Sequence, residues 1–440
     1  MKKAVIASLL TLLFCGSDDT AVTTPTTFDT TFGSSGVVQT TMGSGQSQVT
    51  KILVESSTDK IYAIGWLMSG GTQLAVARYS KDGVLDTTFG SSGKLVTNFS
   101  GFGFEASDAV FDSSGNIYIS GTSGTSTGGN GNNFAIAKIT SSGTVDTTFD
   151  SDGLATFDTA TVTSVTAFST DYGTGLARRG DGALYIAAHT NVSNSGTLTQ
   201  ALAGLLTSAG ALNTAFSSDG LAVQALGSTK NDLTRAIASD SSNRALLAGS
   251  VYNGSNYDFF VARFTSVGAL DTTFGTSGKT LVDVSSDDYL QQMVLQSDGS
   301  ILLLGYTGSS PRSLTIAKLK SDGSLDASFG SSGKVSYSMN YSDTISETKR
   351  IADMVVDTSG RIYIGGYHSI SDTSKMSIMR FTSAGVLDTS FGNSGISSAP
   401  SGTTVGQVQA LAIQSSGKVI AGGNIGANSD RHFTLSRFSP

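Results

Sequence analysis

The side chains that most often perform catalysis are few in this 440-residue sequence and lie far apart in it. The three histidines are His189, His368 and His432, and the single cysteine is Cys15. No Cys/His spacing typical of zinc ligands, no nucleophile elbow and no phosphate-binding glycine loop accompanies them. An enzyme built on this chain, such as a lyase or a hydrolase, would have to bring His189, His368 or acidic loop residues together through its fold.

An aspartate recurs in seven similar segments, where two small residues, usually threonines, separate it from a phenylalanine. Carboxylates can bind a metal, but aspartates about 60 residues apart, one per repeat, would be spread around the molecule. Asn213 replaces the aspartate in the fourth segment and can still accept backbone N–H bonds, so we predict that this side chain fixes a turn. The segments are Phe28–Gly33, Leu85–Gly90, Val145–Asp150, Leu212–Ser217, Leu270–Gly275, Leu325–Gly330 and Leu387–Gly392.

Two further acidic groupings are fragments of a calcium-binding pattern. Asp150 and Asp152 belong to a D-S-D-G sequence, and Asp287 and Asp288 form a pair. Calcium needs more clustered oxygen ligands than either fragment supplies, and both fit ordinary turns. We therefore predict no metal site and no cofactor.

The phenylalanine of each segment is predicted to pack between neighbouring repeats. A ring of equal units closes when each unit presents the same large side chain to the next, and burying a phenylalanine stabilises by roughly 1.5–3 kcal/mol. The phenylalanines are 55 to 67 residues apart: Phe32, Phe89, Phe149, Phe216, Phe274, Phe329 and Phe391.

Each repeat contains four short strand patterns, labelled a to d. In the second repeat they cover Lys94–Phe99 (a), Asp108–Phe111 (b), Ile117–Ser120 (c) and Phe134–Ile139 (d). In these segments apolar residues alternate with polar ones or form short β-branched runs, and glycine-containing turns lie at both ends of each segment. No segment keeps the 3.6-residue apolar period of a helix. The composition agrees, because Gly is abundant at 53 residues and only 14% of residues are charged.

Four strands per unit, repeated seven times, predict an all-β fold. We expect a seven-bladed β-propeller of four-stranded antiparallel blades, about 60 residues per repeat, over residues 28–440. A β-solenoid is the alternative, although its units are shorter. The ring could close in two ways: the chain could end cleanly at Phe433–Ser439, or blades could run b-c-d-a, with Val37–Met42 completing the last blade.

The repeat resembles the delta-60 repeats of bacterial surface and secreted proteins. The resemblance rests on L-D-T-T-F-G-x-x-G-K segments such as Leu85–Lys94 and Leu270–Lys279, joined by hairpins such as Ala109–Gly121, and it extends from Phe28 to the C-terminus. The fourth repeat departs most from the pattern. The resemblance implies a propeller-like fold and export, and it implies little about a ligand.

The first residues have the features of an export signal. Two lysines precede Ala4–Phe14, a mainly apolar stretch of eleven residues that is too short to span a bilayer. Cys15 follows at the position that is lipidated in bacterial lipoproteins, although Phe14 is larger than the residue usual there; alternatively, a signal peptidase could cut after Ser17. We predict a signal over residues 1–15, a Thr-rich tether over 16–27, and an outer-membrane or cell-surface lipoprotein, or a secreted protein if Cys15 is not lipidated.

The net charge of −7 and the absence of a basic stripe exclude nucleic acid as the expected partner. Contact with a membrane is expected only through a lipid anchor at Cys15, and the chain is expected to be a monomer.

An even number of strands per unit sorts the connections onto two faces. The b–c turns and the d–a segments share one face and hardly vary among repeats, whereas the a–b and c–d loops share the other face and vary. Variable loops on a rigid scaffold usually carry function. The loops expected there include Phe99–Ser107, Thr122–Asn132, Asp158–Gly175, Tyr252–Asp258 and Ser338–Lys349.

One position at this variable face differs from repeat to repeat after a constant small residue. Exposed aromatic side chains supply binding area at low entropic cost, so we predict a ligand-binding ring, to which Phe102, Phe104, Tyr172 and Tyr257 could add. The alternative is that these side chains cover the ends of the sheets. The ring residues are Trp66, Thr122, His189, Ser250, Tyr306, Tyr367 and Asn424.

The sequence thus favours a non-catalytic module that binds a protein or a glycan through its variable face. The alternatives are a propeller enzyme with a pocket on that face and a purely structural surface protein.

Overall fold

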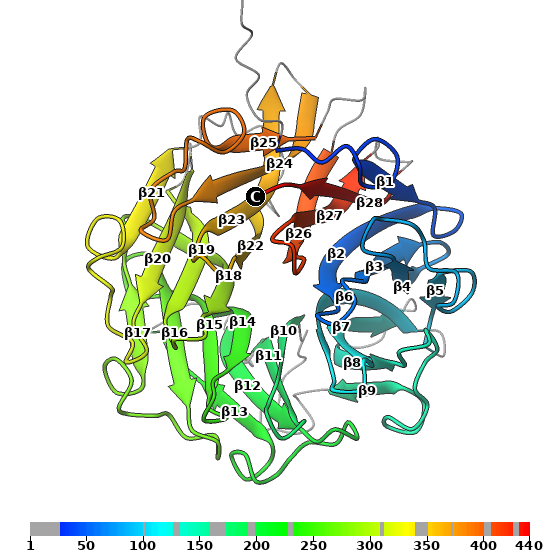
Figure 1. Cartoon of the computed structure of the whole chain (residues 1–440). Helices are drawn as coiled ribbons and strands as arrows, with labels where there is room; N and C mark the ends of the chain where they lie inside the picture. Colours follow the sequence, from blue (N-terminus) through cyan, green and yellow to red (C-terminus); the bar gives the residue numbers. More distant parts are fainter. Residues whose placement is uncertain are drawn as a thin grey trace, which may run out of the picture.

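The chain forms a seven-bladed β-propeller, with all strands arranged around one central axis (Figure 1). The computed structural model describes residues 27–440 except 100–101, 126–132, 158–171, 192–198, 228–231, 309–311, 339–350, 371–372, 400–405 and 426–430. No helix among these residues is long and apolar enough to cross a membrane.

Each blade is an antiparallel sheet of four strands, and the predicted fold class is therefore confirmed. From the axis outward the strands follow the order b, c, d, a (Figure 1). Blades 1 to 3 consist of β2 (Gln46–Val54), β3 (Ile61–Met68), β4 (Thr72–Tyr79) and β5 (Lys94–Thr97); β6 (Phe102–Phe111), β7 (Ile117–Thr125), β8 (Asn133–Ile139) and β9 (Leu154–Phe157); and β10 (Tyr172–Arg178), β11 (Leu184–Asn191), β12 (Thr199–Leu206) and β13 (Leu221–Gln224).

The remaining blades repeat this order. Blades 4 to 6 consist of β14 (Leu233–Ser239), β15 (Ala245–Tyr252), β16 (Tyr257–Phe264) and β17 (Lys279–Val282); β18 (Asp288–Leu295), β19 (Ile301–Thr307), β20 (Ser313–Leu319) and β21 (Lys334–Ser338); and β22 (Ile351–Val356), β23 (Ile362–Ile370), β24 (Thr373–Phe381) and β25 (Ile396–Ser398). Blade 7 contains β26 (Gly406–Ile413), β27 (Val419–Ile425), β28 (His432–Phe438) and β1 (Val37–Thr40).

The ring closes through its two ends. β1, from the start of the propeller, is the outer strand of blade 7 and pairs antiparallel with the last strand, β28. This confirms the second closure that the sequence allowed, in which an N-terminal strand completes the last blade. The pairing also covers the strand edge that an open ring would expose.

The two faces differ in their connections as expected from the strand count. The connection from the third to the fourth strand has 14 residues in blades 1 to 6, as between Tyr79 and Lys94. On the opposite face, the connections from one blade to the next range from 4 residues between β5 and β6 to 14 between β9 and β10. We call these the constant face and the variable face.

Several of the expected variable loops are partly strand. β6 begins at Phe102, and β7 extends to Thr125, so much of Phe99–Ser107 and the start of Thr122–Asn132 are paired with each other. A β-bulge at Ser107 interrupts the alternation of side chains, which explains why the sequence pattern of this strand is recognisable only from Asp108 onward. Most of Asp158–Gly175 and Ser338–Lys349 lies outside the described residues.

The repeated phenylalanines are the packing units between blades, as predicted. All seven are at most 1% exposed. Phe89, for example, belongs to a cluster that joins residues of β3 and β4 to residues of β6, β7 and β8, and the ring of Tyr62 meets it edge-on at 5.8 Å. The core is therefore a series of clusters at the blade junctions.

The repeated aspartates fix turns, which confirms that prediction also. Thr88 N donates to Asp86 Oδ1 at 3.1 Å, and Ala215 N makes the same bond to Asn213. A second role was not anticipated, because Arg78, eight residues before Asp86, donates to its other oxygen at 2.9 Å. Equivalent pairs are Lys138–Asp146, Arg263–Asp271, Lys318–Asp326 and Arg380–Asp388, and, across the ring closure, Arg437–Asp29.

Candidate functional site

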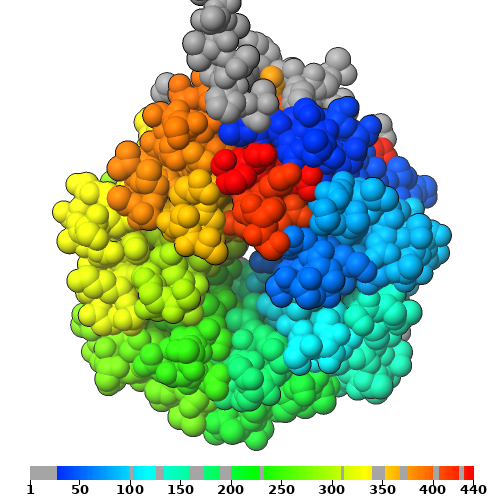
Figure 2. All heavy atoms as spheres, in the orientation of Figure 1, coloured from blue at the N-terminus to red at the C-terminus, as the bar shows by residue number. Residues whose placement is uncertain are grey.

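A β-bulge interrupts each of the seven inner strands at the same place, directly after the residue that pairs with the small residue of the second strand. Each bulge inserts one extra residue and turns polar side chains toward the axis. These residues line a cavity of about 250 Å³ at the centre of the ring, where Figure 2 shows the surface hollowed. The bulged residues are Thr50, Ser107, Thr174, Arg235, Gln291, Ala352 and Gln409.

Three of the four charged side chains that line this central cavity are held by other protein groups, whereas Arg235 forms no ion pair among the described residues. Lys51 Nζ lies 2.7 Å from Asp108 Oδ1. Asp353 accepts bonds from Gln292 Nε2, Met354 N and Leu411 N, each at 2.8 Å. Because these partners come from different blades, the polar groups tie the inner strands together.

The electrostatics of the cavity agree with this pairing. Burial alone would lower the pKa of Lys51, but the charges of Asp108 and Asp353 outweigh it and hold that pKa above its ordinary value. Burial raises the pKa of Asp353, opposed by the charge of Lys51. Sequence patterns give no sign of this cavity, because its residues differ in type from blade to blade.

The seven predicted ring residues occupy equivalent places in the second strand of each blade, next to the variable face. Ser250 and Asn424 are buried, with 2% and 4% of their surface exposed, and the Ser250 hydroxyl accepts a bond from Leu290 N at 2.8 Å. The side chains of His189 and Tyr367 lie outside the described residues. Partly exposed members are Trp66, Thr122 and Tyr306.

The bulge also explains the small residue before each ring position. A Cβ atom on Gly65 would lie 1.9 Å from Gln48 O, and one on Gly423 would lie 1.8 Å from Gln407 O. The neighbouring inner strand therefore leaves no room for a Cβ atom at these two glycines, whereas alanine occupies the equivalent position 188 in blade 3. The small residue is thus explained by the close approach of two backbones, and it is no evidence that the following ring residue binds a ligand.

The additional aromatic residues divide into two groups. Phe104 is wrong as a surface residue, because it is fully buried against Phe99 between two blades. Tyr257 is partly exposed, and the side chains of Phe102 and Tyr172 lie outside the described residues.

Four partly exposed tyrosines form a continuous row across the junction of blades 4 and 5, which we call the tyrosine row. They stand at strand ends that meet on the variable face. Successive ring centroids are 5.5, 5.2 and 5.5 Å apart from Tyr252 to Tyr257, Tyr289 and Tyr306. The guanidinium of Arg312 lies 4.4 Å from the centroid of the Tyr306 ring.

The tyrosine row offers both apolar faces and hydrogen-bonding groups. Burial, together with the neighbouring charge of Asp287, raises the pKa of Tyr289 to about 12, so that its hydroxyl is protonated at neutral pH. The sequence analysis found Tyr306 and Tyr257 but not their partners, because Tyr252 and Tyr289 come from two different blades.

The histidines are distributed over three blades. His189 lies in β11 of blade 3, His368 in β23 of blade 6 and His432 at the start of β28 in blade 7. The side chains of the first two lie outside the described residues.

Five segments of the chain match the family model described as "Domain of unknown function (DUF5122) beta-propeller". They cover residues 57–89, 113–149, 241–274, 296–329 and 358–391, and each ends at or next to the phenylalanine of a repeat. The chain is a β-propeller repeat protein. No curated protein sequence matches it.

Solved propellers resemble this repeat protein in fold. The polysaccharide lyase Uly1 is 12% identical, with a TM-score of 0.50 over 91% of each chain. Drosophila Semaphorin 2a is 10% identical, with a TM-score of 0.43 over 91% of this chain and 76% of its own. The Pseudomonas aeruginosa periplasmic gluconolactonase PpgL is 11% identical, with a TM-score of 0.41 over 90% of this chain and 96% of its own. Likeness at these identities extends to the fold alone.

Proposed function

We propose that this propeller is a non-catalytic binding module that engages a glycan through its variable face. The observation that supports this most is the tyrosine row, a partly exposed aromatic strip at the junction of two rigid blades. Tyrosine presents a large amphipathic surface with few rotatable bonds, so little conformational entropy is lost when a ligand binds. The C–H face of a sugar ring can stack on such side chains while its hydroxyls bond to tyrosine O–H groups and Arg312.

The central cavity supports a binding function better than catalysis. A general acid or base needs a carboxylate or amine free to exchange a proton with a substrate. Both oxygens of Asp353 accept bonds from the protein itself, and Lys51 is held by Asp108. A propeller enzyme is the alternative, since this cavity still gathers four charged side chains, including Arg235.

The proposal is tested by measuring binding of the purified propeller to an array of immobilised bacterial and plant polysaccharides. We expect at least one polysaccharide to be bound, and the double variant Tyr289→Ala/Tyr306→Ala to weaken that binding by more than about tenfold. Tyr337→Ala is the matched control, because Tyr337 lies in the outer strand of the same blade. Unchanged binding by the double variant would contradict the proposal, and release of shortened saccharides during incubation would favour the enzyme.

We further propose that the chain is exported, as the resemblance to delta-60 repeat proteins implies, and that it is lipidated at Cys15. The basic residues, the short apolar stretch and the cysteine support this. Metabolic labelling with a fatty acid should mark the wild type and not Cys15→Ser. Secretion of unlabelled wild-type protein into the medium would argue for cleavage after Ser17 instead.

A further inference from the structure

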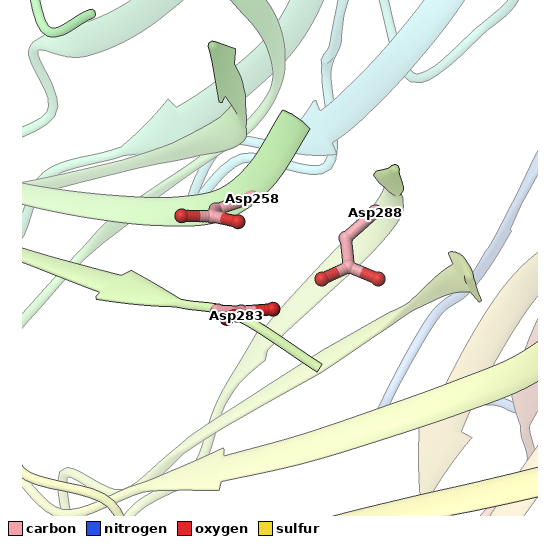
Figure 3. Close-up of side chains that lie close together, drawn as sticks. All are labelled: Asp258, Asp283 and Asp288. Carbon is pink, nitrogen blue, oxygen red and sulfur yellow. The ribbon is translucent and has the colours of Figure 1, made fainter. Parts of the chain in front are cut away.

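Three aspartates meet on the variable face beside the tyrosine row, and we call them the aspartate trio. Asp258 is the second residue of the third strand of blade 4, Asp283 follows the outer strand of that blade, and Asp288 begins the inner strand of blade 5. One carboxylate oxygen from each lies within 4.8 Å of the others (Figure 3). Three like charges this close repel one another unless a cation or protons compensate them.

Two members of the trio have buried oxygens that no protein group satisfies. Asp258 and Asp288 are 4% and 0% exposed. One oxygen of each is bonded, since Asn253 Nδ2 donates to Asp258 Oδ2 at 2.8 Å and Val284 N donates to Asp288 Oδ2 at 2.7 Å. The Oδ1 atoms of both are buried and accept no hydrogen bond. An unpaired buried carboxylate oxygen is costly, so these atoms require a partner.

Lys334 carries a positive charge close enough to lower the pKa of Asp258, but its ammonium group is bonded elsewhere. Its Nζ donates to the backbone carbonyl of Asp283 at 2.6 Å, and among the described residues it forms no ion pair with any carboxylate of the trio. Equivalent lysines at two other junctions bond to a backbone carbonyl in the same way, Lys94 to Thr41 and Lys279 to Leu226. The lysine at this position therefore links neighbouring blades at all three junctions. Two of these junctions have no aspartate trio among the described residues, so neutralising the trio is not the general role of this lysine.

We propose that the aspartate trio binds a divalent cation, with Ca²⁺ as the favoured ion. Two oxygens bound to one Ca²⁺ at roughly 2.3–2.6 Å can be at most about 5 Å apart, which the trio satisfies. All three candidate ligands are carboxylate oxygens, the donors that hard cations prefer, and Mg²⁺ demands a stricter octahedral arrangement than strand ends from two blades readily provide. Waters would complete the coordination, since the exposed Asp283 leaves one side of the site open to solvent.

Burial is the largest influence on the ionisation of the two buried aspartates. It raises the pKa of Asp258, and the charge of Asp283 adds to this, whereas the bond from Asn253 and the charge of Lys334 oppose it. Burial also raises the pKa of Asp288, with the charge of Asp258 acting in the same direction and the Thr307 hydroxyl and Val284 N acting against it. A bound divalent cation would reverse this effect by favouring the charged carboxylates.

The position of the site gives it a further consequence. Tyr257 and Tyr289, the middle members of the tyrosine row, directly precede Asp258 and follow Asp288 in the chain. A cation held by both blades would fix these two tyrosines relative to each other. The cation would thus order the surface proposed to bind a glycan, although cation binding itself does not depend on that proposal.

The adjacent tyrosines permit a direct test with terbium, a luminescent ion that replaces Ca²⁺ at oxygen sites. After treatment with a chelator, the full propeller is titrated with terbium and excited through tyrosine. We expect sensitised terbium emission that Ca²⁺ displaces more effectively than Mg²⁺. Asp258→Asn, Asp283→Asn and Asp288→Asn should each weaken terbium and Ca²⁺ binding by more than about tenfold.

The matched control is Asp322→Asn, which makes the same charge change on the constant face and should leave both affinities unchanged. Asp283 is exposed, so its variant also separates loss of a ligand from loss of folding. No sensitised emission from the wild type, or emission that survives all three substitutions, would overturn the cation site. Either result leaves the glycan proposal standing, because polysaccharide binding is measured separately in the presence of chelator.

Discussion

The constant face and the variable face are built from the same strands yet use aspartate in opposite ways. On the constant face Asp86 accepts bonds from Thr88 N and Arg78, so its charge is fully compensated. On the variable face Asp258 and Asp288 each leave a buried oxygen without a partner. The first arrangement stabilises the ring by itself, whereas the second needs something from solution.

The difference is also visible in pKa values. The bond from Lys138 lowers the pKa of Asp146 on the constant face. Burial raises the pKa of Asp232, which stands where the loop before blade 4 ends on the variable face. The paired aspartates of the constant face stabilise the ring. The variable face can therefore carry buried carboxylates that cost stability. The comparison predicts large stability effects for substitutions on the constant face and small ones on the variable face.

The largest effect is expected for Phe274→Ala on the constant face. Phe274 is fully buried, and truncating a buried phenylalanine removes its transfer free energy and leaves a cavity, which costs about 4 kcal/mol. Urea denaturation followed by circular dichroism measures the change. Val267→Ala is the control, since Val267 lies in the same connection and is 60% exposed. Equal effects of the two substitutions would show that these phenylalanines do not hold the blades together.

The next largest effect concerns ring closure. Arg437 Nε lies 2.7 Å from Asp29 Oδ2, and both side chains are nearly buried. Lys418 Nζ lies 2.8 Å from the same oxygen, so removing Arg437 leaves Asp29 with one of its two cations and also removes the bond from Arg437 to Lys81 O. We therefore expect Arg437→Leu to lower the free energy of unfolding by about 3 kcal/mol.

The fourth repeated segment, which lies in blade 3, suggests how this loss could be reversed. There Asn213 stands in place of the aspartate, and Leu205 stands eight residues earlier, in place of the arginine. The double variant Asp29→Asn/Arg437→Leu copies this natural pair. It should be more stable than the sum of the two single changes predicts, by at least about 1 kcal/mol in a double-mutant cycle. Additive effects would mean that the two residues act independently in closure.

These paired residues also show what the sequence could and could not predict. The strand pattern and the seven phenylalanines were sufficient for the fold, because period and spacing are visible in one chain. The pairs of arginine or lysine with aspartate were not predicted, although within the chain they are always eight residues apart. The signal was available, because Leu205 replaces the basic residue in the one segment where Asn213 replaces the aspartate.

The bulges and the aspartate trio could not be predicted in the same way. A bulge leaves no fixed residue type, as the change from Thr50 to Arg235 to Ala352 shows. The trio combines positions 258, 283 and 288, and only the pairing of strands in two blades brings them together. In the sequence Asp288 stands beside Asp287, and this pair alone predicts no metal site.

A smaller effect is expected from the pH dependence of Asp232 on the variable face. Burial raises its pKa to about 6, above the value of about 3.9 in the unfolded chain. The folded protein thus binds more protons than the unfolded one between these values, so the contribution of Asp232 to stability falls as pH rises from about 4 to 6. This shift corresponds to about 3 kcal/mol at pH 7, which solvent screening reduces to about 2 kcal/mol.

Asp232→Asn removes this titration. The difference in unfolding free energy between wild type and variant should therefore change over that pH range and stay constant above about pH 7. A difference independent of pH from 4 to 7 would show that Asp232 is ionised normally in the folded state.

The smallest effect is expected for Asp283→Asn, and its sign should depend on calcium. In chelator the substitution removes one of three repelling charges at an exposed position, so stability should rise by a few tenths of a kcal/mol. In excess Ca²⁺ the wild type gains the binding free energy of the cation, whereas the variant has lost a ligand, so the order of melting temperatures should reverse. Asp86→Asn on the constant face should lower the melting temperature equally in both conditions, because its charge is already compensated by Arg78. If Ca²⁺ reverses the effect of Asp283→Asn on the melting temperature but leaves the effect of Asp86→Asn unchanged, the two faces have different roles. The constant face closes the ring, and the variable face binds.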